Sequence, residues 1–376
     1  MKNISFNKQD LQGKELEYIR DALKDCHVSG DGSFTQKASS LLERKLNVAK
    51  ALITTSCTHA LEMTALLMNL KPGNEVIIPS FTFVSTVNAF VLRGIKPVFA
   101  DIRRDTLNLD ESLLERLINQ NTKAIVPVHY AGVACELNEI IKIAKKNKLY
   151  IIEDNAHGLF GKYRNKYLGT FGNFSTLSFH ETKNFSCGEG GALLINDEKY
   201  IKRAEIIREK GTNRSEFFRG QVDKYSWVDI GSSYLPSDIL AAFLYAQLEV
   251  NKSIQNKRKE IWNYYFNNLK DWAHSNNIRL PFVPDHCDQS YHMFYIILPS
   301  LQERTRFIIE MKKMNINCVF HYTPLNDTPM GNKFGWVRGD CPVSEDLSDR
   351  IVRLPFYNNL FPDINFVINN ILKFKI

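Results

Sequence analysis

Short apolar runs alternate with helix-like segments between residues 50 and 200. The apolar runs read KALITTS, EVIIPS, KPVFAD, AIVPVHYAG, LYIIEDNAHG, FSTLSFH and GALLIND. Between them, the spacing of apolar side chains predicts helices over residues 59–70, 84–93, 113–118 and 136–148. Strands that are apolar on both faces and separated by helices are typical of a mostly parallel sheet with helices on both sides. We therefore predict an α/β fold with such a sheet at its centre.

A second, smaller α/β pattern follows this series. A long helical pattern covers residues 236–272, and after it come the strand-like run MFYIILP, a helix over residues 303–314 and the strand-like run INCVFHYTP. We interpret the change near residue 250 as a domain boundary. The prediction is a large domain over residues 1–250, beginning with an N-terminal helical arm, and a small C-terminal domain over residues 251–376.

Composition and charge narrow the class of ligand. The chain has 376 residues, 44% of them hydrophobic, which is enough for a large core and a second unit. Its 48 basic and 41 acidic residues give a net charge of +7 that is not gathered into a basic run, which favours a small anionic ligand over nucleic acid. No apolar run reaches the roughly 18 residues of a membrane span, and the polar start MKNISFNKQD is unlike a signal peptide. We expect a cytoplasmic protein that binds neither nucleic acid nor a membrane.

The cysteines and short motifs argue against a metal enzyme or a serine hydrolase. The seven cysteines are scattered, with no CxxC pair, and are expected to be reduced thiols rather than disulfides or zinc ligands. The sequence contains no HExxH motif and no cluster of histidine and aspartate ligands, so no metal site is predicted. A GxSxG nucleophile elbow is missing as well.

Two charged residues follow strands of the predicted sheet. Ligands of such sheets bind at the carboxyl ends of the strands. Asp154 ends the run LYIIED, and Lys183 lies in SFHETKNFSCGEGG after the next strand. Taken singly, a structural salt bridge explains Asp154 and a surface position explains Lys183. Together on neighbouring strand ends they suit pyridoxal phosphate: the lysine forms the Schiff base, and the carboxylate keeps the pyridine nitrogen protonated.

A cradle for the cofactor's phosphate is predicted at the turn SCTHALEM. Its helical amides, with the hydroxyls of Ser56 and Thr58, would bind a phosphate at the helix N-terminus. A simple N-cap is the alternative for Thr58. Phe83, at the next strand-to-helix turn, offers a stacking face for a flat ring, with an ordinary core position as the alternative.

A set of motifs along the chain resembles one known family. SCTHALEM, PSFTFVSTVNAF, PVHYAG, IIEDNAHG, SFHETKNFSCGEGGALL, REKGTN, DIGSSYLPSDILAA and VFHYTPL follow in the order and spacing of the sugar nucleotide aminotransferases of the DegT/DnrJ/EryC1/StrS family. The resemblance covers nearly the whole chain. It implies a fold-type I pyridoxal phosphate enzyme that is a homodimer with active sites at the subunit interface. Related dehydratases of this fold carry a histidine in place of the lysine, so Lys183 favours transamination.

The resemblance assigns roles residue by residue. Lys183 matches the Schiff-base lysine, Asp154 the partner of the pyridine nitrogen, and Phe83 the aromatic residue that stacks on the ring. The other cofactor positions are matched by Cys57 and Thr58 in the phosphate loop, Ser178 at the phosphate, His157 near the 3-oxygen, Ser233 reaching across the dimer, and Glu189, Gly190 and Gly191 in the turn after the lysine.

Three positions depart from the family pattern. His157 replaces a glutamine, Ser233 replaces an asparagine, and Asn326 stands where the HYxPLH motif has its last histidine. These changes concern the cofactor's surroundings and the sugar. The residues expected to contact the substrate are Arg214, Arg219 and Lys224, in a segment that is either a loop over the substrate or a solvated loop, and His321, Tyr322 and Asn326.

The resemblance also implies a reaction. The run EKGTNRSEFFRGQVDKYSWVDIGSSYL is most similar to transaminases that make dTDP-4-amino-4,6-dideoxygalactose. We expect the amino group of L-glutamate to be moved to C4 of dTDP-4-dehydro-6-deoxy-D-glucose, for a surface polysaccharide such as enterobacterial common antigen or O-antigen. The gluco epimer of the product is the alternative, and a regulatory or binding protein that keeps the fold without catalysis is a more distant one.

Overall fold

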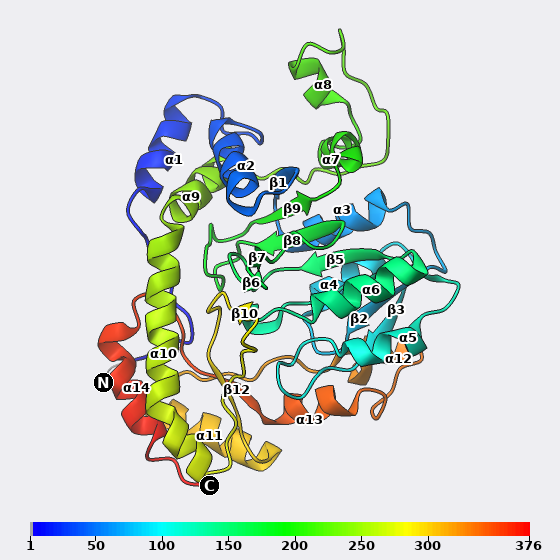
Figure 1. Ribbon diagram of the computed structural model, residues 1–376. Helices are drawn as coiled ribbons and strands as arrows, with labels where there is room; N and C mark the ends of the chain where they lie inside the picture. The colour runs from blue at the N-terminus through cyan, green and yellow to red at the C-terminus, as the bar shows by residue number, and fades with distance from the viewer. Residues whose placement is uncertain (1–2) are drawn as a thin grey trace.

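The computed structural model describes residues 3–376 and has a seven-stranded sheet at its centre (Figure 1). The strands lie in the order β1-β9-β8-β5-β4-β2-β3. Their bounds are β1 Lys50–Thr54, β2 Glu75–Pro79, β3 Lys96–Ala100, β4 Thr122–Ile125, β5 Tyr150–Asp154, β8 Phe174–Ser178 and β9 Gly191–Ile195. Neighbouring strands pair in parallel except at β9, which is antiparallel to both β1 and β8. The predicted mostly parallel sheet is confirmed.

The reversed strand β9 brings three chain segments to one edge of the sheet. Gly191, at the start of β9, pairs with Thr54 at the end of β1 and with Ser178 at the end of β8. Because β1 and β8 both end where β9 begins, the turns that leave β1 and β8 lie beside the glycine turn that enters β9. The carboxyl ends of the parallel strands therefore gather polar residues that are far apart in sequence.

Helices cover both faces of the sheet, as the two-sided apolar strands require. One face is covered by α3 (Cys57–Leu67), α4 (Val84–Val91) and α7 (Ile201–Arg208). The other is covered by α2 (Ser33–Leu46) and α9 (Asp238–Glu249) over β1, β8 and β9, and by α5 (Leu114–Leu117) and α6 (Leu137–Asn147) over the remaining strands. Leu52 and Ile53 of β1 show the alternation, since Leu52 packs with α3 and Ile53 packs with α2.

The C-terminal part packs its own core. It contains α10 (Asn251–Ser275), α11 (Leu301–Lys313), α14 (Phe361–Ile371) and a two-stranded sheet of β11 (Tyr295–Ile297) and β12 (Ile351–Arg353). Buried side chains from these elements form one cluster that also includes Ile4 from the N-terminal segment. The N-terminal segment around Ile4 thus packs against the C-terminal unit.

Two sequence predictions are wrong in this region. The single helix predicted over residues 236–272 is two helices, because the chain breaks at Val250 between α9 and α10. The strand predicted in INCVFHYTP is absent: Val319 forms an isolated bridge with Arg353, and Tyr322 has a left-handed backbone with φ of 39° that ends the extended course.

The remaining elements are short connections. The helices are α1 (Glu15–Lys24), α8 (Arg214–Phe218), α12 (Pro329–Lys333), α13 (Pro342–Arg350) and the 3-10 turns η1 (Glu111–Leu113), η2 (Tyr130–Gly132), η3 (Glu198–Tyr200) and η4 (Leu325–Asp327). A small sheet joins β10 (Cys287–Asp288), β6 (Lys162–Tyr163) and β7 (Lys166–Tyr167). Within residues 3–376 no helix is both long and apolar enough to cross a membrane.

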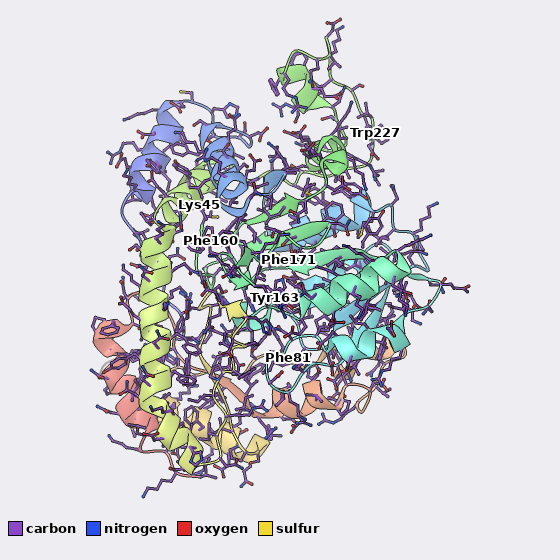
Figure 2. The ribbon with its side chains drawn as sticks, in the orientation of Figure 1. Lys45, Phe81, Phe160, Tyr163, Phe171 and Trp227 are labelled. Carbon is purple, nitrogen blue, oxygen red and sulfur yellow. The ribbon has the colours of Figure 1, made fainter. Side chains whose placement is uncertain are left out.

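One cluster joins the central sheet to the C-terminal unit. Phe81, which is labelled in Figure 2, and Tyr130 follow strands of the large sheet and pack with Tyr295 and Leu347 of the C-terminal part. This contact holds the C-terminal segments against the carboxyl edge of the sheet. In contrast, α8 and the loop after it extend away from the body of the molecule (Figure 1).

Candidate active site

A cavity of about 590 Å³ opens at the carboxyl edge of the sheet. Its walls come from the turns after β1, β2, β5 and β8, and from C-terminal residues that include the segment 320–322 and the end of β12. The sequence-predicted residues that it brings together are Ser56, Cys57, Thr58, Phe83, Asp154, His157, Ser178, Lys183, Glu189, Gly190, His321 and Tyr322.

One end of the cavity has the character of an anion site. Helix α3 begins there, and the Ser56 hydroxyl caps it by accepting a hydrogen bond of 3.1 Å from the amide of His59. The hydroxyls of Thr58 and Ser178 line the same cavity. A side chain on Gly191 would bring its Cβ within 2.3 Å of the Cys57 nitrogen, so only glycine lets β9 approach the start of the helix this closely. Free amides, hydroxyls and the helix dipole together fit a phosphate.

Asp154 lies at the end of β5 with only 5% of its surface exposed. Its carboxylate accepts hydrogen bonds from the Thr86 hydroxyl at 2.7 Å and from the Ala156 amide at 3.2 Å. Burial raises the pKa of Asp154, and the bonds from Thr86 and Ala156 and the charge of Lys183 oppose this rise. A buried carboxylate with these partners is suited to hold a protonated ring nitrogen.

The neighbouring Glu153 is fully buried and points away from the cavity. It accepts hydrogen bonds from His129 at 3.0 Å and from the amides of Gly169, Phe171 and Gly172 at 2.7 to 2.8 Å. Burial alone would raise its pKa, but the bond and charge of His129 and the backbone amides bring the pKa below its usual value. The structural ion pair considered for Asp154 thus belongs to Glu153, because successive side chains of a strand face opposite sides.

Lys183 lies in the turn that follows β8, where its amide donates to the carbonyl of His180 at 2.9 Å. Its amine lines the cavity that Asp154 also lines. Burial lowers the pKa of Lys183 from the ordinary 10.5 to about 8, with the charge of Asp154 acting in the opposite direction. The surface position considered for this lysine is therefore wrong. A larger share of the amine is neutral at pH 7 than in a free lysine, as a nucleophile or proton acceptor requires.

Aromatic and imidazole rings form the wall above this pair. Phe83 is 55% exposed, which excludes the core position considered for it, and its ring lies 6.1 Å from that of Tyr322. The rings of His157 and His292 are stacked at 4.2 Å, and His321 accepts or donates a 2.7 Å hydrogen bond with the Tyr130 hydroxyl.

The three histidines are held neutral. Burial lowers the pKa of His157, His292 and His321 well below the usual value, and the charges of Lys183 and Arg353 add to this effect. Within residues 3–376, Nδ1 of His157 is buried without a hydrogen-bond partner. A polar atom of a ligand in this part of the cavity would supply one.

Six predicted residues do not line this cavity; one of them is Gly191, at the start of β9, which packs against the start of α3. Ser233 and Lys224 are exposed, Arg219 pairs with Glu205 at 2.9 Å, and Arg214 lies 3.9 Å from Glu209. Asn326 is fully buried, and its side chain bonds Ser80 and Glu345 at 2.5 and 2.7 Å. Within one subunit, Asn326 therefore serves the packing beneath the cavity.

Several lining residues were not predicted from the sequence, among them Thr86, His292 and Arg353. Thr86 could have been predicted from the sequence, because it lies three positions after Phe83 and so on the same side of α4. His292 and Arg353 come from C-terminal segments without a local motif, and only the packing of that unit on the sheet brings them to the cavity.

Comparison with known proteins agrees with this geometry. Residues 9–372 match the DegT/DnrJ/EryC1/StrS aminotransferase family. The chain belongs to this family. The GDP-perosamine synthase of Escherichia coli O157:H7 is 30% identical to this aminotransferase over 361 residues, which are 96% of this chain and 95% of that protein. The UDP-4-amino-4-deoxy-L-arabinose--oxoglutarate aminotransferase of Shewanella sediminis is 30% identical over 368 residues, 95% and 92% of the two chains.

A solved structure with the same fold contains pyridoxal phosphate. Spr1654 of Streptococcus pneumoniae in its PLP form has a TM-score of 0.91 to this aminotransferase at 25% identity, covering 98% of this chain and 97% of that chain. The protein is thus a pyridoxal phosphate-dependent sugar nucleotide aminotransferase with the fold-type I architecture. The cavity fits the cofactor, since it offers an anion cradle, a buried carboxylate, an amine of lowered pKa and an exposed aromatic face.

Proposed function

We propose that this aminotransferase moves the amino group of L-glutamate to C4 of dTDP-4-dehydro-6-deoxy-D-glucose and releases dTDP-4-amino-4,6-dideoxy-D-galactose. The product would serve a cell-surface polysaccharide such as enterobacterial common antigen or O-antigen, made in the cytoplasm. The observation that carries the reaction type is the meeting of Lys183 and Asp154 in one cavity with the phosphate cradle of α3. The choice of sugar rests on the resemblance of residues 209–235 to transaminases with this product.

Each cavity residue has a defined task in this proposal. The start of α3 with Thr58 and Ser178 binds the cofactor's phosphate, and Asp154 holds its pyridine nitrogen protonated. Phe83 packs against the ring. When bound, the cofactor supplies an electron sink for the carbon that loses or gains a proton. Nζ of Lys183 carries that proton, and a pKa of about 8 lets it act as base and acid near neutral pH.

His157 is assigned to the cofactor's 3-oxygen. Its neutral ring has an unpartnered Nδ1, so it is able to exchange one hydrogen bond with that oxygen. His321 and Tyr322 are assigned to the sugar, since both reach the cavity from the C-terminal unit.

We further propose that the enzyme is a homodimer. The segment around α8 projects from the body and exposes apolar side chains, with Trp227 exposed to 80% (Figure 2). The other exposed apolar residues of this arm are Phe217, Phe218, Tyr225, Val228 and Ile230. An apolar arm of this kind is typical of a subunit contact. A second copy would cover it, and Ser233, Arg214, Arg219 and Lys224 would then contribute to the partner's cavity.

The test is an assay of the purified enzyme with pyridoxal phosphate, L-glutamate and 4-keto-6-deoxy sugars linked to dTDP, GDP or UDP. Preference for the dTDP sugar with an axial C4 amine, read from proton NMR coupling constants, supports the proposal. An equatorial amine identifies the gluco epimer instead. A preference for another nucleotide overturns the substrate assignment.

Matched variants test the reaction type itself. Lys183→Ala is expected to abolish amino sugar formation, whereas Lys199→Ala, at an exposed lysine outside the cavity, should leave it unchanged. If Lys183→Ala kept much of its turnover, or if the native enzyme aminated no sugar nucleotide, catalysis through this site would be refuted.

A further inference from the structure

Arg353 enters the cavity from a rigid part of the C-terminal unit. It is the last residue of β12 and pairs with Tyr295 of β11. On its other side, its amide donates to the carbonyl of Val319 at 2.7 Å and its carbonyl accepts from the Val319 amide at 3.1 Å. The backbone is held from two directions, and the side chain forms part of the cavity wall. Its position is therefore defined before any ligand binds.

Over the described part of the chain, the guanidinium of the partly buried Arg353 makes no side-chain hydrogen bond or ion pair, unlike the buried Arg258. Within residues 3–376, its Nε is buried without a hydrogen-bond acceptor. The ring of Phe6 lies 4.5 Å from the guanidinium carbon and covers one face. Burial lowers the pKa of Arg353, and the groups that oppose this are the phenols of Tyr130 and Tyr322, not carboxylates. A guanidinium stays protonated even so, so within residues 3–376 a partly buried positive charge remains without a carboxylate partner.

Arg258 shows what a structural arginine looks like in the same unit. Its guanidinium donates to the carbonyl oxygens of Tyr291 at 2.9 Å and His292 at 2.6 Å, and to the side chain of Asn358 at 3.1 Å. These bonds hold the segment that carries His292. Arg353 differs because its Nε, one of the nitrogens through which a guanidinium binds a carboxylate, has no hydrogen-bond partner within residues 3–376, and because its side chain lines the cavity.

The charges of the cavity also call for an anion beside Arg353. Two acidic side chains line the cavity within residues 3–376. Asp154 is engaged by Thr86 and assigned to the cofactor's nitrogen, and Glu189 is largely exposed and lies 3.6 Å from His180. The phosphate cradle is built from a different element, the start of α3, and uses backbone amides. The C-terminal wall therefore carries a positive charge that is separate from the phosphate cradle.

We propose that Arg353 binds a carboxylate of the amino donor. This inference rests on the proposed transamination from L-glutamate, and it names the group that recognises the donor. A planar guanidinium takes a carboxylate through two parallel hydrogen bonds, which fixes its orientation as well as its distance. Anchored from β12, the donor would present its amino group toward Lys183, which lines the same cavity.

The experiment follows the donor half-reaction of the holoenzyme, without any sugar. L-Glutamate is mixed with the enzyme, and the absorbance change of the bound cofactor gives the apparent dissociation constant for the donor. Arg353→Gln should raise this constant about 10- to 100-fold, the range expected for a lost charged hydrogen-bonding group. Arg353→Lys keeps the charge but loses the planar group that makes two parallel hydrogen bonds. Its dissociation constant for the donor should lie between those of the native enzyme and Arg353→Gln. Arg350→Gln, which removes an arginine of the Asp346 ion pair outside the cavity, should match the native enzyme.

A second readout does not depend on turnover. Glutarate carries the carboxylates of the donor without its amino group, and calorimetry should detect its binding to the native holoenzyme and to Arg350→Gln, with at least tenfold weaker binding to Arg353→Gln. Equal melting temperatures and cofactor spectra establish that the variants are folded and loaded; if Arg353→Gln is not, Arg353→Lys decides. Unchanged glutamate and glutarate affinities would overturn the proposal.

The sugar half-reaction tests whether Arg353 binds an anionic group of the sugar nucleotide instead of the donor. Starting from the pyridoxamine form, the keto sugar nucleotide should react with Arg353→Gln as it does with the native enzyme. A defect confined to this half-reaction would overturn the proposal and assign Arg353 to the sugar nucleotide. If the donor results hold but the native enzyme aminates no sugar nucleotide, the proposed sugar function fails while the role of Arg353 stands.

Discussion

The hydroxyl of Thr86 donates a 2.7 Å hydrogen bond to the carboxylate of Asp154. The bond joins the first turn of α4 to the end of β5 and is reinforced by a 2.9 Å contact between the hydroxyls of Thr82 and Thr86. The bond from Thr86 therefore opposes the rise that burial causes in the pKa of Asp154. Under the proposed role of Asp154 at the cofactor's nitrogen, Thr86 would be a positioning residue for that carboxylate.

Removing the Thr86 hydroxyl should lower the catalytic rate and shift the pH profile of kcat/KM. Burial already raises the pKa of Asp154 and Thr86 lowers it, so Thr86→Val should raise it further. The acid limb of kcat/KM is then expected at higher pH, because protonated Asp154 no longer holds the ring nitrogen's charge. The lost bond to a charged group, about 1.5 to 3 kcal/mol, predicts a fall in rate of about 10- to 100-fold. Thr86→Ser keeps the hydroxyl and should have the native rate and the native acid limb. A pH profile of Thr86→Val identical to the native one would contradict this role of Thr86.

Lys183 should make the apoprotein's stability depend on pH. Its folded pKa of about 8 is below the ordinary 10.5, so the unfolded chain binds more protons between these values. The cost of burying the charged amine is fully present below pH 8 and disappears as pH rises to about 10.5. Lys183→Met removes that cost, about 3 kcal/mol at 1.4 kcal/mol per pKa unit. Urea unfolding of both apoproteins should show a variant that is more stable at pH 7 and an advantage that shrinks above pH 8; an advantage independent of pH would argue against the lowered pKa.

Gly191 should be required for the phosphate cradle. A Cβ there would come within 2.3 Å of the backbone at both Ser56 and Cys57, so Gly191→Ala must push β9 away from the start of α3. We expect a loss of about 1 to 3 kcal/mol in stability and weaker binding of pyridoxal phosphate, measured by cofactor titration. Gly188→Ala, in open space with φ of +85°, adds backbone strain alone and should cost about 1 kcal/mol without a comparable loss of cofactor affinity. Equal cofactor affinity in both variants would contradict the packing argument.

The arm around α8 should control association. Replacing Phe218 and Trp227, exposed to 68% and 80%, by serine removes the largest apolar surface of the arm. Sedimentation equilibrium should show a dimer for the native enzyme and a shift toward monomer for this double variant. Ile309→Ser, at an exposed apolar site on α11, serves as the control and should leave the dimer intact. A native monomer would refute the dimer proposal.

Local patterns were sufficient for the elements of the large sheet. The seven strands of the large sheet coincide with the apolar runs, since strands buried on both faces are mostly apolar. The long helix predicted over residues 236–272 is a case in which the local pattern was not sufficient. Its apolar spacing continues through Val250, and the break there reflects the packing of α9 on the sheet and α10 on the C-terminal core.

The sequence by itself determined the fold class, the family and the identity of the two central residues. Lys183 and Asp154 each come after a buried strand, and parallel strands place the turns at their carboxyl ends along one edge of the sheet. Their assigned roles, like those of the other cofactor and substrate residues, stay predictions.

Only the tertiary structure decided which other groups surround them. Glu153, not Asp154, took the ion pair because of the side of β5 that it faces, and Asn326 was drawn into packing with Ser80 and Glu345. Arg353 reached the cavity from β12 through contacts between residues far apart in the chain. How deeply a side chain is buried, which way it points and whether it finds a hydrogen-bond partner depend on the whole packed molecule. The spacing of residues in the sequence reflects only neighbours along the chain.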